Sequence, residues 1–220
     1  MVFIGIPTYD GKLHWKTTSG LINFARYCGE KKVGLAVDVI PGDAFISKAR
    51  SLIAHRFLKS NFRDLVFIDA DIGFNAFDVA RLCKAEAPIV CGLYRMKKNE
   101  VRYPALLFDP IVRNQQDPSL IKLQYGPTGF MRIRREVFEA MMKKWPNEYY
   151  VNVGEQKVYD FFPAGRDGIN FTGEDINFCK RAQACGFDIW AMQNVEMEHV
   201  GEKSWDSNWS IDSLQIQEAA

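Results

Sequence analysis

The sequence has few of the features that mark a secreted, disulfide-bonded or membrane-spanning protein. Its 220 residues include five cysteines, an odd number, and no Cys-x-x-Cys pair, which excludes a disulfide framework and a four-cysteine zinc site. No apolar run approaches the ~18 residues that cross a bilayer, and the N-terminus lacks the basic start and long apolar core of a signal peptide. We therefore expect reduced thiols, no membrane span and a cytoplasmic location.

An excess of charge of either sign is also missing. The chain has 28 lysines and arginines against 27 aspartates and glutamates, a formal net charge of +1. This balance excludes a nucleic-acid-binding protein that works through bulk positive charge, and it excludes an acidic disordered tail. We therefore expect no nucleic-acid partner.

Internal repeats, low-complexity segments and Ser/Gly linkers are absent as well. The hydrophobic content of 47% and the charged content of 25% are ordinary for a globular domain. A chain of this length buries roughly 70% of its unfolded surface in one core. The sequence predicts a single domain over residues 1–220, and we keep open that this domain is one module of a longer polypeptide.

The first half of the chain alternates short apolar runs with amphipathic stretches. The apolar runs predict strands, and apolar residues at helical spacing predict helices between them. The expected strands cover 2–7, 33–40, 65–68 and 88–93, and the expected helices cover 19–30, 45–57, with Asp43 as its N-cap, and 77–87. Such alternation implies βαβ units and a largely parallel sheet.

The second half is less regular and predicts a mixture of elements. Strands are expected at 105–108, 121–125, 130–133, 189–192 and 195–200, and helices at 135–145, 172–185 and, loosely, 209–220. The expected fold class is therefore α/β, with a mostly parallel central sheet flanked by helices and a mixed α+β second half.

Asp69 and Asp71 form the strongest chemical motif, in the run Phe-Ile-Asp-Ala-Asp at the end of the strand 65–68. In extended backbone, residues i and i+2 point to the same side, and ligands of open α/β sheets bind beyond the carboxyl ends of the strands. Two carboxylates at such close quarters repel each other unless a cation joins them. The pair favours a hard divalent cation such as Mg²⁺ or Mn²⁺; the alternative is that one aspartate caps a turn and the other is solvated.

Two further motifs lie in the second half. His199, in the segment Glu-His-Val-Gly, is a candidate ligand for Mn²⁺, although a lone histidine is more often a structural hydrogen-bonding group. The segment Thr172-Gly173-Glu174-Asp175 opens a helix, where Thr172 and Asp175 fit the spacing of a capping box. The same carboxylates also suit a general base that is aimed into a cleft.

Polar residues in the first half suggest recognition of a nucleotide. Thr8 and Tyr9 follow the first strand, where a polar loop with an aromatic ring can hold a nucleobase, and Asp38 can accept from a base or ribose donor. Arg50 suits a phosphate. The other basic candidates for phosphate are Lys48, Arg95, Lys97 and Lys98. For each of these charges taken alone, a solvated surface position is the plainer explanation.

In their order and spacing, these motifs resemble the GT-A-fold, nucleotide-sugar-dependent glycosyltransferases. The match runs through IPTYD at 6–10, the carboxylate of the second strand, FIDAD at 67–71, TGFM at 128–131, GED at 173–175 and EHVG at 198–201. It covers nearly the whole chain. The most similar group is the small glycosyltransferase domains of large algal viruses, which act on capsid glycans.

The resemblance implies a role for each motif residue. Asp69 faces the ribose and the metal, Asp71 binds the metal directly, and His199 completes the metal site. Asp175 is the base of an inverting transfer, and Glu174 holds the acceptor or the donor sugar. The rest of the donor site follows by position: Thr8, Tyr9 and Asp38 at the uracil, Arg50 and Ala70 beside the nucleotide, and Gly129 in the sugar pocket.

The resemblance also implies the reaction. It indicates a Mn²⁺ or Mg²⁺ ion, a UDP-sugar donor of glucose, galactose or rhamnose type, and a hydroxyl acceptor on a glycan or glycoprotein. Residues 1–110 would form the nucleotide-donor half and residues 111–210 the acceptor half. The second strand carries the single Asp38 rather than a paired acidic motif, which leaves the choice of base open.

Three other functions fit parts of the pattern. A dehalogenase-type phosphotransferase also uses Asp-x-Asp, but at the end of its first core strand, whereas 64 residues precede Leu65. A nucleotidyltransferase shares the architecture but needs a glycine-rich, basic loop after the first strand, where only Gly11 occurs. A non-catalytic nucleotide-sugar or carbohydrate-binding module suits the aromatic content of 13%, yet a pure binding protein needs no base.

Overall fold

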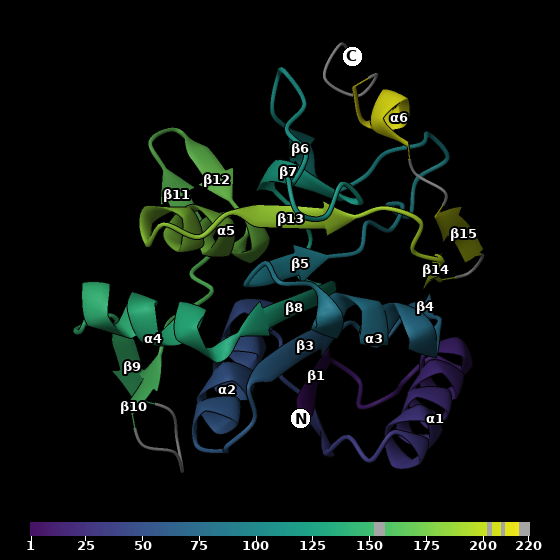
Figure 1. Ribbon diagram of the computed structural model, residues 1–220. Coiled ribbons are helices and arrows are strands. Elements are labelled where there is room, and N and C mark those ends of the chain that lie inside the picture. The colour runs from purple at the N-terminus through teal and green to yellow at the C-terminus, as the bar shows by residue number, and fades with distance from the viewer. Residues whose placement is uncertain (152–156, 202–203, 208–209, 216–220) are drawn as a thin grey trace.

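The computed structural model describes residues 1–151, 157–201, 204–207 and 210–215, and its centre is an eight-stranded sheet (Figure 1). The strand order is β2-β1-β3-β8-β5-β13-β7-β6. The strands are β1 (Val2–Thr8), β2 (Leu35–Pro41), β3 (Asp64–Ile68), β5 (Ile89–Cys91), β6 (Leu106–Leu107), β7 (Leu120–Tyr125), β8 (Phe130–Arg134) and β13 (Ile189–Met192). All of them run in one direction except β7 and β8. The predicted α/β class with a mostly parallel central sheet is confirmed.

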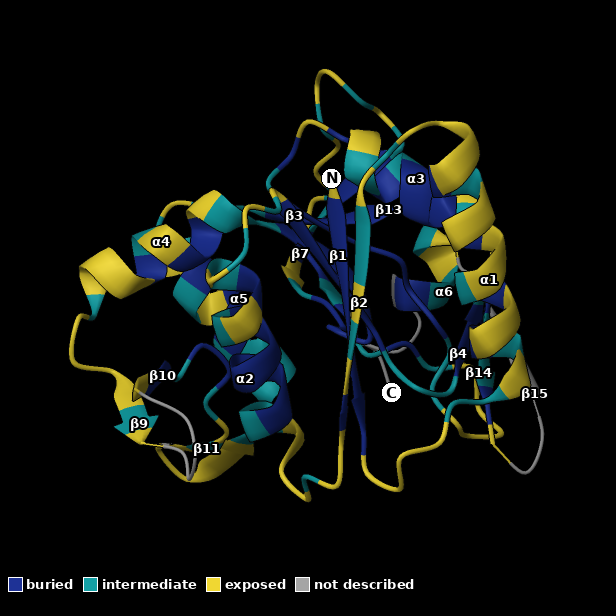
Figure 2. Cartoon of the chain, turned by 90° about the horizontal axis from the view of Figure 1, so that it is seen from below, coloured by how far each residue is buried: buried dark blue, intermediate teal, exposed yellow. Residues whose placement is uncertain are grey.

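Helices cover both faces of this sheet. They are α1 (Trp15–Glu30), α2 (Ile46–Leu58), α3 (Ala76–Lys84), α4 (Arg135–Lys144), α5 (Glu174–Ala184) and α6 (Ile211–Gln215). Successive strand residues point to opposite faces, so Phe3 packs in one core with α2, α4 and α5, while Ile4 packs in a second core with α1 and α3. Figure 2 shows the buried strands between two layers of helices with exposed outer sides.

Strand β8 comes from the second half of the chain and lies antiparallel between β3 and β5. Met131 pairs with Phe67 on one side and with Cys91 on the other. The two halves of the chain therefore contribute to one sheet. This pairing is a long-range contact, and the local pattern of apolar residues contains no sign of it.

The structure also contains short strands outside the central sheet. A small antiparallel sheet has the order β15-β14-β4, and two hairpins pair β9 with β10 and β11 with β12. Their bounds are β4 (Ile72–Phe74), β9 (Tyr149–Val151), β10 (Lys157–Tyr159), β11 (Gly165–Asp167), β12 (Asn170–Thr172), β14 (Met197–Val200) and β15 (Ser204–Ser207). Of these, only β14 falls in a predicted strand, because three or four residues are too few to show an alternation.

Three predicted helices have shifted ends. Helix α1 begins at Trp15 rather than at 19, since the His14 side chain accepts a hydrogen bond from the backbone of Lys16 and starts the helix there. Helix α3 ends at Lys84 rather than at 87. Of the helix predicted over 209–220, the part Ile211–Gln215 is observed, and 209 and 216–220 lie outside the described residues. No helix in the described part of the chain is both long and apolar enough to cross a membrane.

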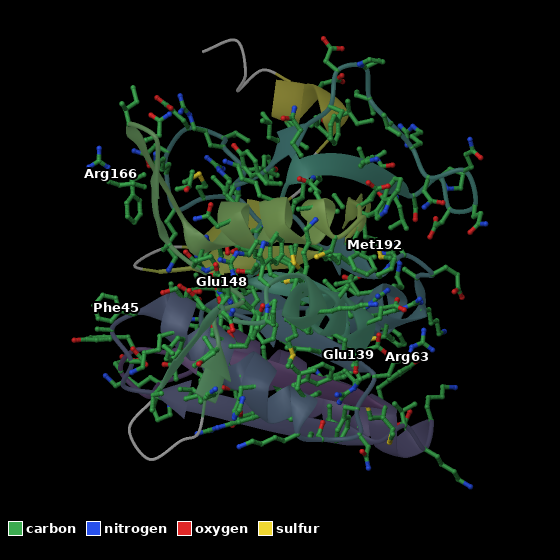
Figure 3. All side chains as sticks on the ribbon, turned by 90° about the vertical axis from the view of Figure 1, so that its left-hand side faces the viewer. Phe45, Arg63, Glu139, Glu148, Arg166 and Met192 are labelled. Carbon is green, nitrogen blue, oxygen red and sulfur yellow. The ribbon has the colours of Figure 1, made fainter. Side chains whose placement is uncertain are left out.

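The two predicted N-caps are wrong. Helix α2 is preceded by Phe45, which makes no side-chain cap and points outward at the edge of the molecule (Figure 3). Asp43 instead accepts from the backbone N–H of Phe45 at 3.0 Å and pairs with Lys48, which forms a turn before the helix. Helix α5 has Gly173 as its N-cap, because the side chain of Asp175 turns into the protein, where it bonds to Thr128.

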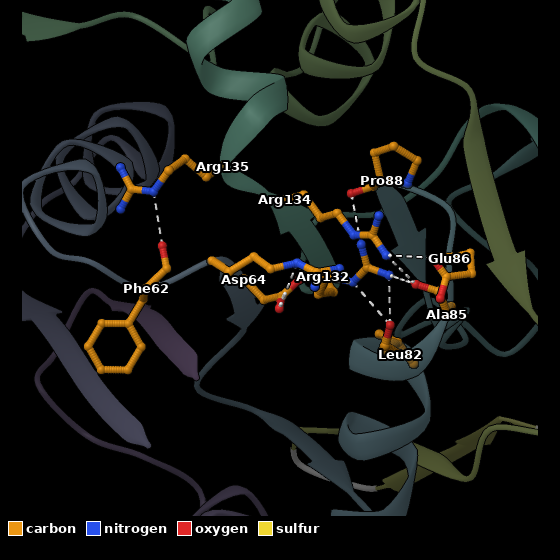
Figure 4. A network of polar contacts seen from close by, with 10 residues as sticks. Phe62, Asp64, Leu82, Ala85, Glu86, Pro88, Arg132, Arg134 and Arg135 are labelled. Atoms are coloured by element: carbon orange, nitrogen blue, oxygen red, sulfur yellow. Dashed lines mark hydrogen bonds and ion pairs between the residues drawn. The ribbon is translucent and has the colours of Figure 1, made fainter. Parts of the chain in front are cut away.

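Arg132, on β8, contacts both the N-terminal end of β3 and the C-terminal end of α3 (Figure 4). Its side chain is fully buried, and its three nitrogens donate to the carbonyl oxygens of Leu82, Ala85 and Pro88 at 2.7–3.0 Å. Asp64, the first residue of β3, lies 3.8 Å from Arg132 Nε. Burial lowers the pKa of Arg132 to about 10, and Asp64 opposes the shift. This arginine satisfies carbonyl groups that the end of a helix leaves without partners.

Candidate functional site

Asp69 and Asp71 lie directly beyond the C-terminal end of β3, at the sheet edge where ligands of α/β proteins bind. The backbone N–H of Asp69 donates to Gly129 O at 2.9 Å, so the turn before β8 holds this segment in place. The two carboxylates contact different groups: Asp69 bonds to Arg50, and Asp71 bonds to Lys97. The turn after β3 therefore supplies carboxylates to two neighbouring clusters.

Arg50 is the centre of the first cluster. Its side chain is 1% exposed, and its Nη2 donates to both oxygens of Asp69, at 2.9 and 3.2 Å. Its Nε lies 3.7 Å from Glu174 Oε1. Within the described chain, Nε and Nη1 of Arg50 have no hydrogen-bond partner. Because a buried donor without a partner is costly, these nitrogens point to a ligand or water that completes the cluster.

Asp175 approaches the same cluster from the start of α5. Its Oδ1 accepts a hydrogen bond from the buried hydroxyl of Thr128. Burial raises the pKa of Asp175, and the nearby Glu174 raises it further, while Arg50 and Thr128 oppose the shift. Burial likewise raises the pKa of Asp69, against the effect of Arg50. A carboxylate with an elevated proton affinity is suited to accept a proton in a reaction.

Asp71, Lys97 and His199 form the second cluster. The Lys97 ammonium bonds to Asp71, and His199 Nε2 lies 3.6 Å from Asp71 Oδ2. Burial by itself would raise the pKa of Asp71, but the nearby His199 and Lys97 side chains outweigh it and lower that pKa to about 2. Asp71 therefore stays ionised at neutral pH.

The orientation of His199 makes this cluster suitable for a cation. Its Nδ1 lies 2.9 Å from the carbonyl oxygen of Arg95; a carbonyl can only accept, so Nδ1 carries the proton. In the neutral ring, Nε2 then directs a lone pair towards the Asp71 carboxylate. Two acceptors that face each other need a positive charge between them, which a metal ion could supply; in this structure the Lys97 ammonium bonds to Asp71.

The three predicted metal ligands do not form a ready-made cage. In the part of the chain that the structure describes, no group of three or more His, Cys, Asp or Glu side chains is arranged to hold a metal ion. Asp71 and His199 lie together, whereas Asp69 is bonded to Arg50. Mg²⁺ commonly takes one or two protein ligands and completes its shell with water and substrate phosphates. The pair Asp71–His199 has the same small number of protein ligands, and its imidazole suits Mn²⁺ better than Mg²⁺.

Tyr94 is a site residue that the sequence motifs miss. It is buried, and its ring makes an edge-on contact with His199, with ring centroids 5.1 Å apart. A Cβ atom on Gly129 would lie 2.3 Å from both the Tyr94 hydroxyl and Asp69 Oδ2. Only glycine leaves room for them at this position. Tyr94 follows the strand predicted at 88–93, so the rule that ligands bind at strand ends could have drawn attention to it.

The residues predicted to hold the nucleobase make their observed hydrogen bonds with residues outside both clusters. Thr8 is buried and donates to Lys12 O at 2.9 Å, whereas Tyr9 is 74% exposed. Strand β2 continues to Pro41, so Asp38 lies inside it, where one carboxylate oxygen pairs with Arg56 at 3.2 Å and the other is buried without a hydrogen bond. Ala70 contributes its carbonyl oxygen to the start of α1.

Comparison with known proteins shows a likeness of fold. No protein-family model and no curated protein matches the sequence. The structure of A197 from STIV is 16% identical over 96% of both chains, with a TM-score of 0.56. A glycosyltransferase involved in glycosylation of the major capsid of PBCV-1 is 12% identical over 67% of this chain and 66% of its own, with a TM-score of 0.38.

GalNAc-T7, solved with UDP, GalNAc and Mn²⁺, is 11% identical over 91% of this chain and 44% of its own, with a TM-score of 0.47. Identities this low establish architecture and not activity. The chain shares the overall fold of A197 along nearly its whole length, and its function has to be argued from the site itself.

Proposed function

We propose that this protein is a GT-A-type glycosyltransferase that transfers a hexose or deoxyhexose from a UDP-sugar to a hydroxyl group of a glycan. The observation that carries the proposal is the buried Arg50, which has two nitrogens without partners and is surrounded by Asp69, Glu174 and Asp175. A site for an anionic donor and a hydroxyl nucleophile needs this combination of a fixed cation and nearby carboxylates. The ordered sequence motifs support the same function.

The donor diphosphate is proposed to bind beside Asp71 and His199. A divalent cation on these two residues would neutralise the charge that gathers on the leaving diphosphate. Asp69 orients Arg50 through two hydrogen bonds, and Gly129, which leaves room for Asp69 and the Tyr94 hydroxyl, is proposed to line the sugar pocket beside them. Lys97 already contacts Asp71, so it lies within reach of the same phosphates.

Asp175 is proposed to remove the proton from the acceptor hydroxyl. Thr128 holds one of its oxygens, which leaves the other oxygen to accept the proton. The raised pKa of Asp175 matches it to that task, because a general base works best when its pKa lies closer to the operating pH. Inversion at the sugar carbon requires the base on the face opposite the leaving group, whereas retention would not use Asp175 in this way.

The proposal is tested by a screen of nucleotide sugars for slow donor hydrolysis with and without Mn²⁺. We expect release of UDP from at least one of UDP-glucose, UDP-galactose and UDP-rhamnose, and loss of that release with EDTA. Release of inorganic phosphate from simple phosphoesters would instead indicate a phosphotransferase, and pyrophosphate formation from UTP would indicate a nucleotidyltransferase. Binding of a nucleotide sugar with neither hydrolysis nor transfer over an acceptor panel would favour the binding module.

A variant locates the metal site. Asp71→Ala should abolish Mn²⁺-dependent binding of UDP, measured by calorimetry, because it removes the only carboxylate beside His199 Nε2 in the second cluster. Asp188→Ala is the matched control, since this half-exposed carboxylate pairs with Lys122, away from the site. Unchanged Mn²⁺-dependent UDP binding in Asp71→Ala would rule out the assignment.

A further inference from the structure

A groove of about 850 Å³ lies on the side of β14 that faces away from the candidate site. Its walls are α1, the turn between β4 and α3, and the segment that leads into β14; Figure 1 shows α1, α3, β4 and β14 close together in this part of the molecule. Neighbouring residues of a strand point to opposite faces, so Glu198 lines the groove while His199 points to Asp71. The volume is typical of a ligand-binding cleft.

One face of α1 lines the groove with a row of aromatic and polar side chains. Trp15, Ser19, Asn23 and Tyr27 all line it, and their spacing of four residues places them in a row along the helix. The row has an aromatic ring at each end and small polar groups between them. It therefore offers flat apolar surfaces and hydrogen-bonding groups in alternation.

The aromatic rings are left open to solvent. Trp15 is 68% exposed, and Phe77, on the opposite wall, is 65% exposed. The Phe77 ring meets Tyr27 edge-on, with centroids 5.8 Å apart, so the two walls are held in a fixed relation. Large exposed rings beside a groove mark a surface that contacts something else.

The charges of the groove exclude a polyanion. Lys16 bonds to Glu198, and Arg26 pairs with Glu30 at 3.4 Å, so neither basic side chain is left to hold phosphates in excess. Glu196 adds a further exposed negative charge. Nucleic acids and acidic glycans would meet a neutral to negative lining, which does not attract them.

The lining favours a hydroxyl-rich ligand over an amphipathic helix. Val195 and Met197 line the groove, but no leucine or isoleucine does among the described residues, so its aliphatic surface is small for a groove that binds the apolar face of a helix. Asparagines recur instead, with Asn23, Asn75 and Asn194 on its different walls. Amide groups between aromatic rings match a ligand with apolar ring faces and many hydroxyl groups.

We propose that this groove binds a neutral oligosaccharide, at a place separate from the candidate catalytic site. The sugar rings stack on Trp15 and Phe77, and their hydroxyl groups bond to the amides and to Ser19 between them. The inference goes beyond the proposed transfer reaction and does not depend on it, since it uses none of the residues of the two charged clusters.

The test is calorimetric titration of the full chain with neutral hexasaccharides: cellohexaose, maltohexaose, mannohexaose and xylohexaose. We expect at least one to bind, and we expect Trp15→Ala and Phe77→Ala each to weaken it about ten-fold through loss of a stacking surface. Ile22→Ala is the matched control, because this side chain is 65% exposed on the same helix but does not line the groove. UDP binding, measured in the same samples, should stay unchanged in all three variants.

Asn23→Leu separates a sugar from a protein partner. It should weaken oligosaccharide binding, because it removes a hydrogen-bonding amide, whereas an apolar peptide would bind more tightly to the added side chain. Binding of none of the four hexasaccharides by the wild-type chain would overturn the proposal, as would equal affinity in Trp15→Ala, Phe77→Ala and Ile22→Ala. Loss of UDP binding with retained sugar binding would count against the proposed function alone.

Discussion

Strand β3 has an aspartate–arginine pair at each of its ends, and the two pairs differ in how completely they are bonded. At its start, Asp64 lies beside Arg132; just beyond its end, Asp69 bonds to Arg50. Both guanidinium groups are buried, at 0% and 1% exposure. All three nitrogens of Arg132 donate to backbone carbonyls, whereas only Nη2 of Arg50 donates, and only to Asp69.

The difference supports the proposal that Arg132 has a structural role and that Arg50 binds a ligand. Every nitrogen of Arg132 has a carbonyl acceptor at the end of α3, so in this pair only Asp64 Oδ1 is buried without a hydrogen bond. Arg50 keeps two buried donors without partners among carboxylates whose charges hold its pKa above the usual value despite burial. Buried groups that a fold leaves unsatisfied call for an explanation, and the donor proposed to bind at the C-terminal edge of the sheet would provide it.

The largest effect is expected in the cluster around Arg50, for the variant Asp175→Asn. The amide cannot accept the proton of the acceptor, so transfer should fall about a thousand-fold while UDP binding is unchanged. The measurement is kcat for transfer together with calorimetric titration of UDP. Transfer at a near-normal rate would rule out Asp175 as the base, and Asp188→Asn serves as a control for the loss of one carboxylate.

A direct comparison of the two arginines gives the next largest effect. Arg132→Met leaves the carbonyls of α3 and Asp64 without a partner, so the free energy of unfolding should fall by about 3 kcal/mol. Arg50→Met should cost less stability, because Asp69 can take up a proton, but it should remove donor binding. Urea unfolding and UDP titration of both variants check this. An equal loss of stability in the two variants would remove the distinction between the two ends of β3.

Gly129→Ala tests how closely the residues around Asp69 are packed. A Cβ atom 2.3 Å from Asp69 Oδ2 and from the Tyr94 hydroxyl must displace both of them, at a cost of about 2 kcal/mol, which we expect to see as weaker UDP binding. Gly173→Ala is the control, since a Cβ there meets no atom within 4 Å. If both variants bind UDP equally well, the space beside Gly129 has no part in the donor site.

The smallest effect is expected at Lys97. Its ammonium group pairs with the Asp71 carboxylate in this structure, where it would compete with a metal ion. Lys97→Met should therefore bind Mn²⁺ more tightly, by up to about five-fold. Titration of Mn²⁺ without nucleotide measures this directly, and Lys98→Met is the neighbouring control. Weaker Mn²⁺ binding in Lys97→Met would show that Lys97 supports the metal site rather than competing with it.

Much of the fold was predictable because it depends on local patterns. The apolar runs at 2–7 and 65–68 became β1 and β3, since buried strands need apolar residues on both faces. The apolar run at 65–68 also predicted that Asp69 lies just beyond the end of a strand. The N-caps predicted at Asp43 and Thr172 were wrong, because their side chains bind other side chains. Asp43 pairs with Lys48, and Thr172 bonds to Asn177.

The sequence alone determined the α/β class, the carboxylate pair after β3 and the presence of Asp175 at a helix start, because residue type and spacing decide these. Only the tertiary structure decided that β8 pairs between β3 and β5, which places Gly129 against Asp69. It also decided that Arg50 is buried and Arg56 binds Asp38, and that Lys97 and Tyr94 join the site. These contacts join residues far apart in the chain, and the packing of helices on the sheet, rather than any local pattern, sets which side chains meet.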